Sequence, residues 1–257
     1  MDTFERVEER PHPEGARTVA DLVAAAQGSE RITYRRTAEP QNPSRYYSAK
    51  QMGDYVYVPD FLNRPDTLDQ PRPKRKRFHH KSVDSIGPIR IQFRDYGNRR
   101  LAPFYSGWSS SMYLVSDALL NVLRRFDPDG FESALPRLSD ADGEEMHGYT
   151  VVMPTRVIDA VDIMRTTVVV ERHTRAPEIG PSYTLVRYES GPDFRDDVVA
   201  PTFVEEYRPG WYWRLEIVRA VVHAGIRGLY FAHPYKRGAA NEIRLPAEGD
   251  VRHPNDW

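Results

Sequence analysis

The sequence predicts an α+β fold with mainly antiparallel sheets and about three helices. Segments with the composition of strands outnumber segments with helical periodicity along the 257 residues. Most links between successive strands are shorter than about a dozen residues, the length that a parallel crossover connection needs. Apolar residues make up 40% of the chain and charged residues 28%, which is ordinary for a soluble globular protein. We therefore expect strands joined by short turns, with the helices packed against them.

The first hundred residues contain few regular elements. A helix is expected after Thr18, a good N-cap, and before Gly28, which can end a helix. A weak strand is expected at 32–36 and a short aromatic strand at 54–58. In a third strand, at 89–93, apolar and polar side chains alternate as in a strand that is buried on one face.

The best-supported helix begins after Ser116, an N-cap residue followed by Asp117 at the positive end of the helix dipole. Arg124 and Arg125 lie in its last turn, where cations are favoured, and the Asp-Pro-Asp-Gly segment 127–130 ends it. Its buried stripe is formed by three leucines: Leu119, Leu120 and Leu123.

Residues 211–225 are expected to form a third, amphipathic helix that ends at Gly225. Its apolar residues recur at helical spacing: Trp211, Leu215, Val218 and Val222. Since three consecutive residues cannot share one face of a helix, at least one aromatic ring of 211–213 should lie near the surface. The remaining strands are expected at 112–115, 131–138, 149–153, 166–171, 183–189 and 226–232.

Three regions are expected along the chain. Residues 1–100 form an N-terminal extension that carries a Pro-rich basic loop and packs on the rest, residues 101–235 form the α+β core, and residues 236–257 form a polar tail. The charged start and the lack of any apolar run of about 18–20 residues predict a cytoplasmic protein without a membrane partner. No cysteine is present, so disulfides and thiolate metal sites are excluded.

The sequence contains no pattern that is typical of a catalytic, metal or cofactor site. Glycine-rich phosphate-binding motifs are absent, and the eight histidines show no metal-ligand spacing. The strongest exception is Asp159 with Asp162, because two carboxylates three residues apart meet on one face of a helix and could act as acid and base. A solvated turn explains the same residues. The pair therefore supports only the alternative hypothesis that the protein is a hydrolase.

A basic run at residues 72–81 allows three interpretations: a solvated loop, a surface that docks on an acidic protein, or a nucleic-acid-binding segment. The net charge of −1 argues against nucleic acid, which requires a broad basic face. Tryptophan is enriched at binding hot spots. The candidate partner-binding residues are Arg75, Lys76, Arg77, Trp211 and Trp213.

Residues 100–233 resemble a known family. The similarity rests on the serine-capped helix after Val115, a Gly-Phe-Glu segment at 130–132, the aromatic strand at 149–152, the segment 157–162 (Val-Ile-Asp-Ala-Val-Asp), and the closing Gly-Leu-Tyr-Phe at 228–231. In this pattern the chain resembles the immunity protein eleven family, whose members are found beside bacterial polymorphic toxins.

The resemblance implies a non-enzymatic protein that stays in the cytoplasm of the producing cell. It would neutralise a cognate toxin, delivered by a contact-dependent or type VI-like route, by binding it directly. The family offers no catalytic residues to transfer, so none is assigned. The first hundred residues depart from the family pattern and are expected either to carry partner specificity or to be a divergent start.

Overall fold

The computed structural model describes residues 6–28, 30–40, 45–51, 58–61, 89–94, 101–109, 112–173, 183–189, 191–207 and 210–232. The basic run at 72–81, most of the strand expected at 54–58 and the tail expected at 236–257 lie outside these described residues.

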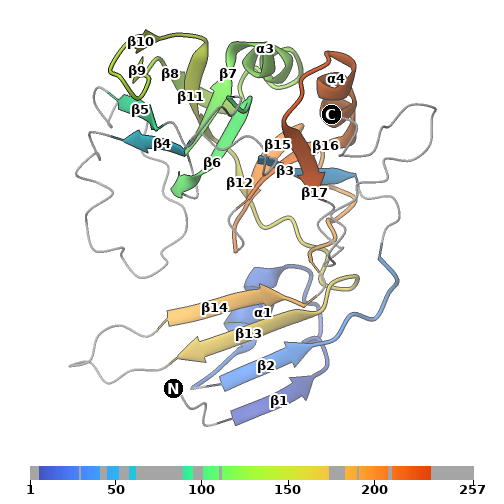
Figure 1. The fold of residues 1–257 in the computed structure, drawn as a ribbon. Coiled ribbons are helices and arrows are strands. Elements are labelled where there is room, and N and C mark those ends of the chain that lie inside the picture. The colour runs from blue at the N-terminus through green and yellow to red at the C-terminus, as the bar shows by residue number, and fades with distance from the viewer. Residues whose placement is uncertain are drawn as a thin grey trace.

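The described residues form an α+β fold with three helices and mainly antiparallel sheets, as the sequence predicts (Figure 1). Sheet A has the order β1 (Arg6–Arg10), β2 (Glu30–Tyr34), β13 (Val168–His173), β14 (Tyr183–Tyr188). Sheet B has the order β12 (Val157–Ile158), β15 (Thr202–Glu205), β16 (Trp211–Arg214), β3 (Tyr46–Gln51), β17 (Leu229–Ala232).

The described residues form two further sheets. Sheet C has the order β10 (Glu145–Met146), β9 (Arg137–Ser139), β5 (Arg90–Arg94), β4 (Val58–Phe61). Sheet D has the order β6 (Phe104–Ser109), β7 (Met112–Ser116), β11 (Tyr149–Pro154), β8 (Phe131–Ala134). The helices are α1 (Val19–Ala25), α3 (Asp117–Phe126) and α4 (Leu215–His223). In Figure 1, α1 lies against sheet A, whereas α3 and α4 lie at the opposite end of the molecule.

The buried side chains form three clusters. The first lies beneath α3 and α4 and includes Trp211 and Trp213. The second joins sheet A and α1 to the other side of sheet B, and Tyr212 belongs to it. The third lies between sheets C and D, around Phe93 and Tyr149. Strand β16 therefore separates two parts of the core, because successive side chains of a strand point to opposite faces.

Local sequence signals are confirmed at the helices and at β5. The side chain of Thr18 accepts a hydrogen bond from the amide of Asp21 and forms a capping box with it. Ser116 caps α3 in the same way, by accepting a hydrogen bond from the amide of Leu119. In β5, Ile91 and Phe93 are buried whereas Arg90 is exposed, as the alternation predicts.

The helix expected at 211–225 is wrong in its first four residues. Trp211–Arg214 form β16, which pairs with β15 and β3, and only Leu215–His223 are helical. All three aromatic rings at 211–213 are buried, so the expected exposed ring is also wrong. The single strand expected at 131–138 is divided into β8 and β9.

Candidate functional site

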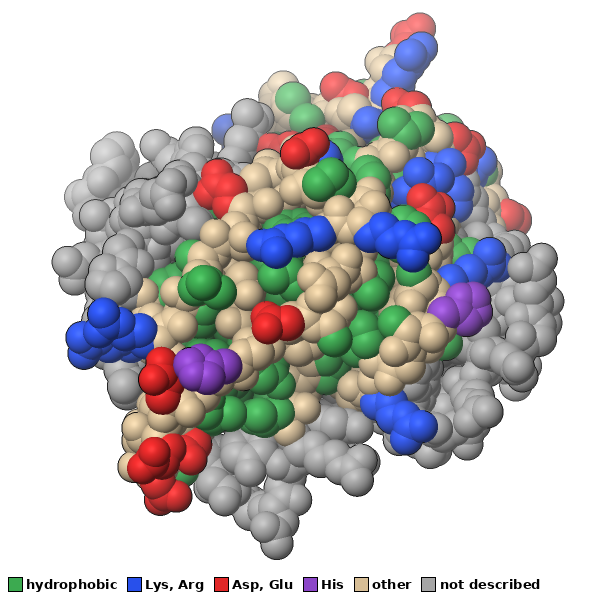
Figure 2. Space-filling view, turned by 90° about the horizontal axis from the view of Figure 1, so that it is seen from above, with side chains coloured by type: hydrophobic (Ala, Val, Ile, Leu, Met, Phe, Trp, Pro, Cys, Tyr) green, Lys and Arg blue, Asp and Glu red, His purple; other side chains and the backbone are tan. Residues whose placement is uncertain are grey.

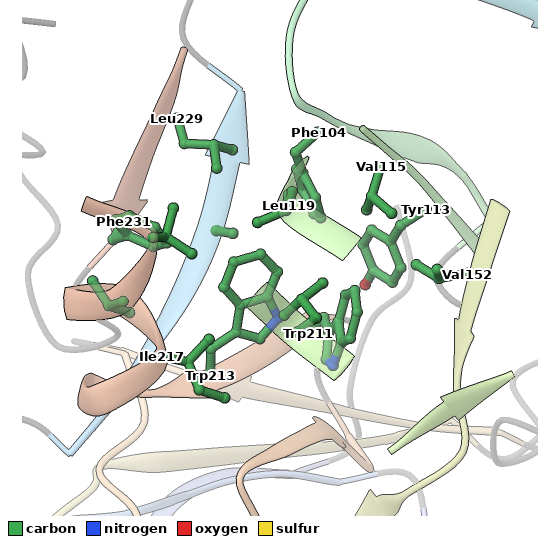
Figure 3. Close-up of a cluster of buried hydrophobic side chains, with 14 of the residues drawn as sticks. Phe104, Tyr113, Val115, Leu119, Val152, Trp211, Trp213, Ile217, Leu229 and Phe231 are labelled. Carbon is green, nitrogen blue, oxygen red and sulfur yellow. The ribbon is translucent and has the colours of Figure 1, made fainter. Parts of the chain in front are cut away.

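The two tryptophans predicted to bind a partner lie in the core beneath α3 and α4 (Figure 3). Trp211 is 2% exposed and Trp213 is 0% exposed. Their rings meet edge to face, with centroids 5.2 Å apart, and Trp213 packs in the same way on Phe104 at 5.7 Å. Such pairs add stability beyond the apolar area that they bury. Both indoles therefore support the surface formed by the helices above them. The other three candidates, Arg75, Lys76 and Arg77, lie outside the described residues.

Asp159 and Asp162 do not share a helical face, because both lie in the irregular segment between β12 and β13. The Asp159 carboxylate accepts hydrogen bonds from the amides of Val19 and Ala20, at 3.2 Å and 2.8 Å, in the first turn of α1. Burial raises the pKa of Asp159, and the two amide hydrogen bonds oppose that shift. This carboxylate satisfies two amides of a helix N-terminus that would otherwise lack intrahelical partners.

The second member of the pair has a separate set of partners. Asp162 Oδ1 accepts hydrogen bonds from the amides of Met164 at 2.9 Å and Arg165 at 3.3 Å. The guanidinium of Arg165 lies 3.3 Å from the other carboxylate oxygen of Asp162. These contacts are those of an Asx turn, in which an aspartate binds the backbone that follows it. The structure thus gives each carboxylate its own backbone contacts, and the helix that the alternative acid–base hypothesis needs does not form at 159–162.

A buried ion pair that sequence reasoning missed joins the end of α3 to sheet B. Asp127, only 2% exposed, lies 2.5 Å from Nη1 of Arg156. Its Oδ2 also accepts hydrogen bonds from the amide and the hydroxyl of Thr202, at 3.1 Å and 2.7 Å. The sequence identified Asp127 only as part of a helix stop. Its partners follow 29 and 75 residues later, so no local pattern could have indicated them.

The outer face of sheet A, on the side away from α1, carries charges that are paired with one another. Glu171, whose side chain is 4% exposed, is contacted by Arg31 at 3.5 Å and by Arg187 at 3.0 Å. Arg35 lies 2.6 Å from Glu9 and 2.9 Å from Glu189, so it joins β1 to the end of β14. These three arginines and three glutamates neutralise one another.

The outer sides of α3 and α4 differ from sheet A, because their arginines have no acidic partners among the residues that the structure describes. Leu119, Leu120 and Leu123 of α3 pack into the same cluster as Ile217 and Val218 of α4. The two helices contact each other, so their opposite sides face solvent together. We call this surface the helical face and define it by four residues: Arg124, Arg125, Arg219 and His223.

The arginines of the helical face are held by neutral groups. Arg124 donates a hydrogen bond to the Ser133 hydroxyl at 3.2 Å, and the guanidinium of Arg125 lies 5.8 Å from the centre of the Phe126 ring. Burial raises the pKa of the Tyr47 hydroxyl to about 12, and the nearby charge of Arg219 opposes the shift. Within the described ranges, none of these three arginines, Arg124, Arg125 and Arg219, forms an ion pair with a carboxylate. Figure 2 looks onto this side and shows Lys and Arg side chains across its middle, with single Asp or Glu side chains near them.

The described residues contain neither a metal-binding cluster nor a membrane-spanning helix. No three or more His, Asp or Glu side chains are grouped so that they could hold a metal ion in the part of the chain that the structure describes. None of the helices α1, α3 and α4 is long and apolar enough to cross a membrane, and these are the helices of the described residues.

Comparison with known proteins identifies the family. No curated protein matches this chain. The model of the immunity protein family Imm11 matches residues 38–233, so the match begins well before the resemblance expected from residue 100. It includes α3, α4 and all of sheets B, C and D, whereas β1, α1 and β2 precede it. Because the matched segment spans more than half of the 257 residues, the chain belongs to the Imm11 immunity protein family.

Proposed function

We propose that the protein neutralises a cognate bacterial toxin by binding it directly, without transforming any molecule itself. Membership of the Imm11 immunity protein family carries this proposal. In the proposal the protein acts in the cytoplasm of the producing cell, against a toxin delivered by a contact-dependent or type VI-like route. Complementary surface charge would then select the cognate toxin and reject others.

Long-range contacts between structured segments favour this mode of action. Asp127 ties α3 to β15 across 75 residues, and Asp159 ties the segment after β12 to α1 across 140 residues. A surface whose supporting elements are already fixed loses less conformational entropy on binding. The contacts therefore support a binding surface that is formed before the toxin arrives.

The five residues proposed for the interface fall into two groups with different roles. Arg75, Lys76 and Arg77 stay in the proposal as cations that would attract an acidic toxin. Trp211 and Trp213 are buried, so we assign them a supporting role beneath α3 and α4 instead of a direct contact. A partner could reach their rings only after the helical layer had moved.

The direct test is co-expression of this protein with the product of the reading frame immediately upstream, in a bacterial host. Growth should be restored, and the two purified proteins should form a one-to-one complex in size-exclusion chromatography. A variant with Asp159→Asn and Asp162→Asn should protect equally well, whereas loss of protection by this variant while it still folds and binds would favour a hydrolase. If the two proteins form no complex and the host is not protected, the proposal fails.

A further inference from the structure

We propose that the helical face of α3 and α4 docks an acidic patch on the cognate toxin. This inference rests on the proposed function and adds the place on the molecule where binding occurs. The observation behind it is a group of arginines, on two adjacent helices, that lack acidic partners in the described residues. An unpaired arginine can form its charge-assisted bonds with another molecule.

The helical face is one continuous surface because of the way its helices pack. The leucine stripe of α3 and the Ile217–Val218 pair of α4 enter the same core cluster. Residues on the opposite side of each helix must then point away from that cluster. In α3 these residues include Arg124 and Arg125, and in α4 they include Arg219. Trp211 and Trp213 fill the space below, so the surface has a fixed support (Figure 3).

Charge distinguishes the helical face from the outer face of sheet A. On sheet A, Arg31, Arg35 and Arg187 each contact a glutamate, so their fields largely cancel beyond the sheet. Beside the helical face, Arg214 at the N-cap of α4 lies 3.3 Å from Glu216, an exposed glutamate in the first turn of that helix. Two exposed acids mark the ends of α3: Asp117 is its first residue, and Asp129 follows its last residue by three positions. The helical face therefore keeps an uncompensated positive charge that can attract an acidic protein over about 8 Å at physiological salt.

Side-chain chemistry favours a protein partner over a nucleic acid. The same helices also carry small residues that are at least partly exposed, namely Ala118 on α3 and Ala220 and Ala224 at α4, so a folded surface can approach them closely. Val122 and Val222 are partly exposed next to them. Arginine is enriched at protein interfaces relative to the rest of the surface. A nucleic-acid surface needs a broad basic stripe, which a chain of net charge −1 with acids at both ends of α3 does not favour.

The test compares two charge reversals on the helical face with a matched reversal elsewhere. One test variant carries Arg124→Glu and Arg125→Glu in α3, and the other carries Arg219→Glu in α4. The control carries Arg90→Glu and Arg137→Glu, two exposed arginines that are neighbours in β5 and β9 of sheet C. The control and the α3 variant change the net charge by the same amount. Because glutamate at the end of α3 opposes the helix dipole, Arg124→Gln with Arg125→Gln is added as a milder variant.

The probe is the purified upstream-encoded toxin, with its association rate measured at low and high salt and each variant checked by thermal unfolding. We expect each helical-face variant to slow association on the order of tenfold at low salt and to lose most of the salt dependence, while the control stays near wild type. Protection of the host should weaken with each helical-face variant and stay near wild type with the control.

The outcomes separate the two proposals. If wild type binds the toxin and protects the host, but both helical-face variants do so equally well, the helical face is the wrong surface and the proposed function stands. If wild type neither binds nor protects, both proposals fall. Binding of wild type to a short DNA duplex that the α3 reversal abolishes, with toxin binding unchanged, would overturn the assignment in favour of nucleic acid.

Discussion

The carboxylate of Asp127 lies 2.5 Å and 2.6 Å, by its two oxygens, from Nη1 of Arg156, at the point where α3 ends. The guanidinium side chain is 33% exposed, whereas the carboxylate side chain is 2% exposed. The pair is therefore asymmetric: the Asp127 carboxylate is buried, whereas the Arg156 guanidinium is partly exposed to solvent. Thr202 supplies the remaining hydrogen bonds to the same carboxylate.

The first prediction is that Asp127→Ala destabilises the protein by about 3 kcal/mol. The change removes one partner of a buried ion pair and leaves the Thr202 hydroxyl and amide without their acceptor. Urea unfolding monitored by tryptophan fluorescence gives the free energy. Asp117→Ala, an exposed aspartate in the first turn of the same helix, serves as the control and should cost only about 0.5 kcal/mol. Equal costs for the two variants would contradict a structural role for the ion pair.

Gly130 leads to the second prediction, because a side chain at this position would overlap the Asp127 carboxylate. Gly130→Ala should therefore destabilise the protein by about 1–3 kcal/mol, since the carboxylate must move away from Arg156. Most of that cost should disappear when Asp127→Ala is already present, because the two effects share one cause. A double-mutant cycle in urea measures the coupling. Additive costs would show that the glycine is needed for another reason.

Asp159 carries the third prediction, which concerns pH. Burial raises its pKa above the ordinary 3.8, so its contribution to stability is fully present below that value and is lost as pH rises through the folded-state pKa. At neutral pH, Asp159→Asn removes the buried charge and keeps an acceptor for the amides of Val19 and Ala20. It should therefore be nearly neutral, whereas Asp159→Ala should cost about 1 kcal/mol.

Unfolding free energies at about pH 7 and about pH 4 test the sign of this effect. Wild type should gain stability relative to Asp159→Asn as the pH falls, because the wild-type carboxyl takes up a proton more readily when folded. A relative gain as the pH rises would mean that the hydrogen bonds from α1 outweigh burial.

The sequence predicted the fold best where local chemistry decides the structure. Thr18 and Ser116 cap α1 and α3 as expected, because a capping side chain contacts amides only a few residues away. The alternation of apolar and polar side chains likewise identified β5, since a repeat of two residues is typical of a strand that is buried on one face. The fold class followed from the number of strands and the shortness of their links.

Prediction failed where tertiary contacts override the local pattern. Trp211–Arg214 satisfy helical spacing, but pairing with β15 and β3 and burial on both faces make them a strand. β1 is rich in charge and reads as loop, yet it pairs in parallel with β2. The contacts of Asp127 and Asp159 join residues 75 and 140 positions apart, so only the fold could reveal them.

The fourth prediction concerns Asp21, whose shift has the opposite sign to that of Asp159. Hydrogen bonds from the amide of Arg17 and from the hydroxyl and amide of Thr18 hold the pKa of Asp21 below 3.8. The contribution of Asp21 to folding stability is therefore present above pH 3.8 and is lost as the pH falls through the folded-state pKa. Asp21→Asn should destabilise α1 at neutral pH, and its difference from wild type should shrink on acidification. Chemical unfolding across the acid range measures this, and a difference that grows on acidification would contradict the assigned shift.

The last prediction decides whether the buried tryptophans bind the toxin or only support the helical face. Trp213→Ala should cost about 3–5 kcal/mol, because it empties a fully buried site against Phe104 and Trp211. Leu135→Ala, at a side chain that is 84% exposed, is the control and should change stability by less than about 0.5 kcal/mol.

Trp213→Phe separates packing from binding, because it keeps an apolar ring and a folded chain. The midpoint temperature of thermal unfolding should fall. The dissociation constant for the toxin, measured well below that temperature, should nevertheless stay within about twofold of wild type. The indole does not reach the surface, so its removal changes binding only through the position of α3 and α4. A tenfold weaker complex with unchanged stability, about 1.4 kcal/mol of binding free energy, would instead return Trp213 to the interface.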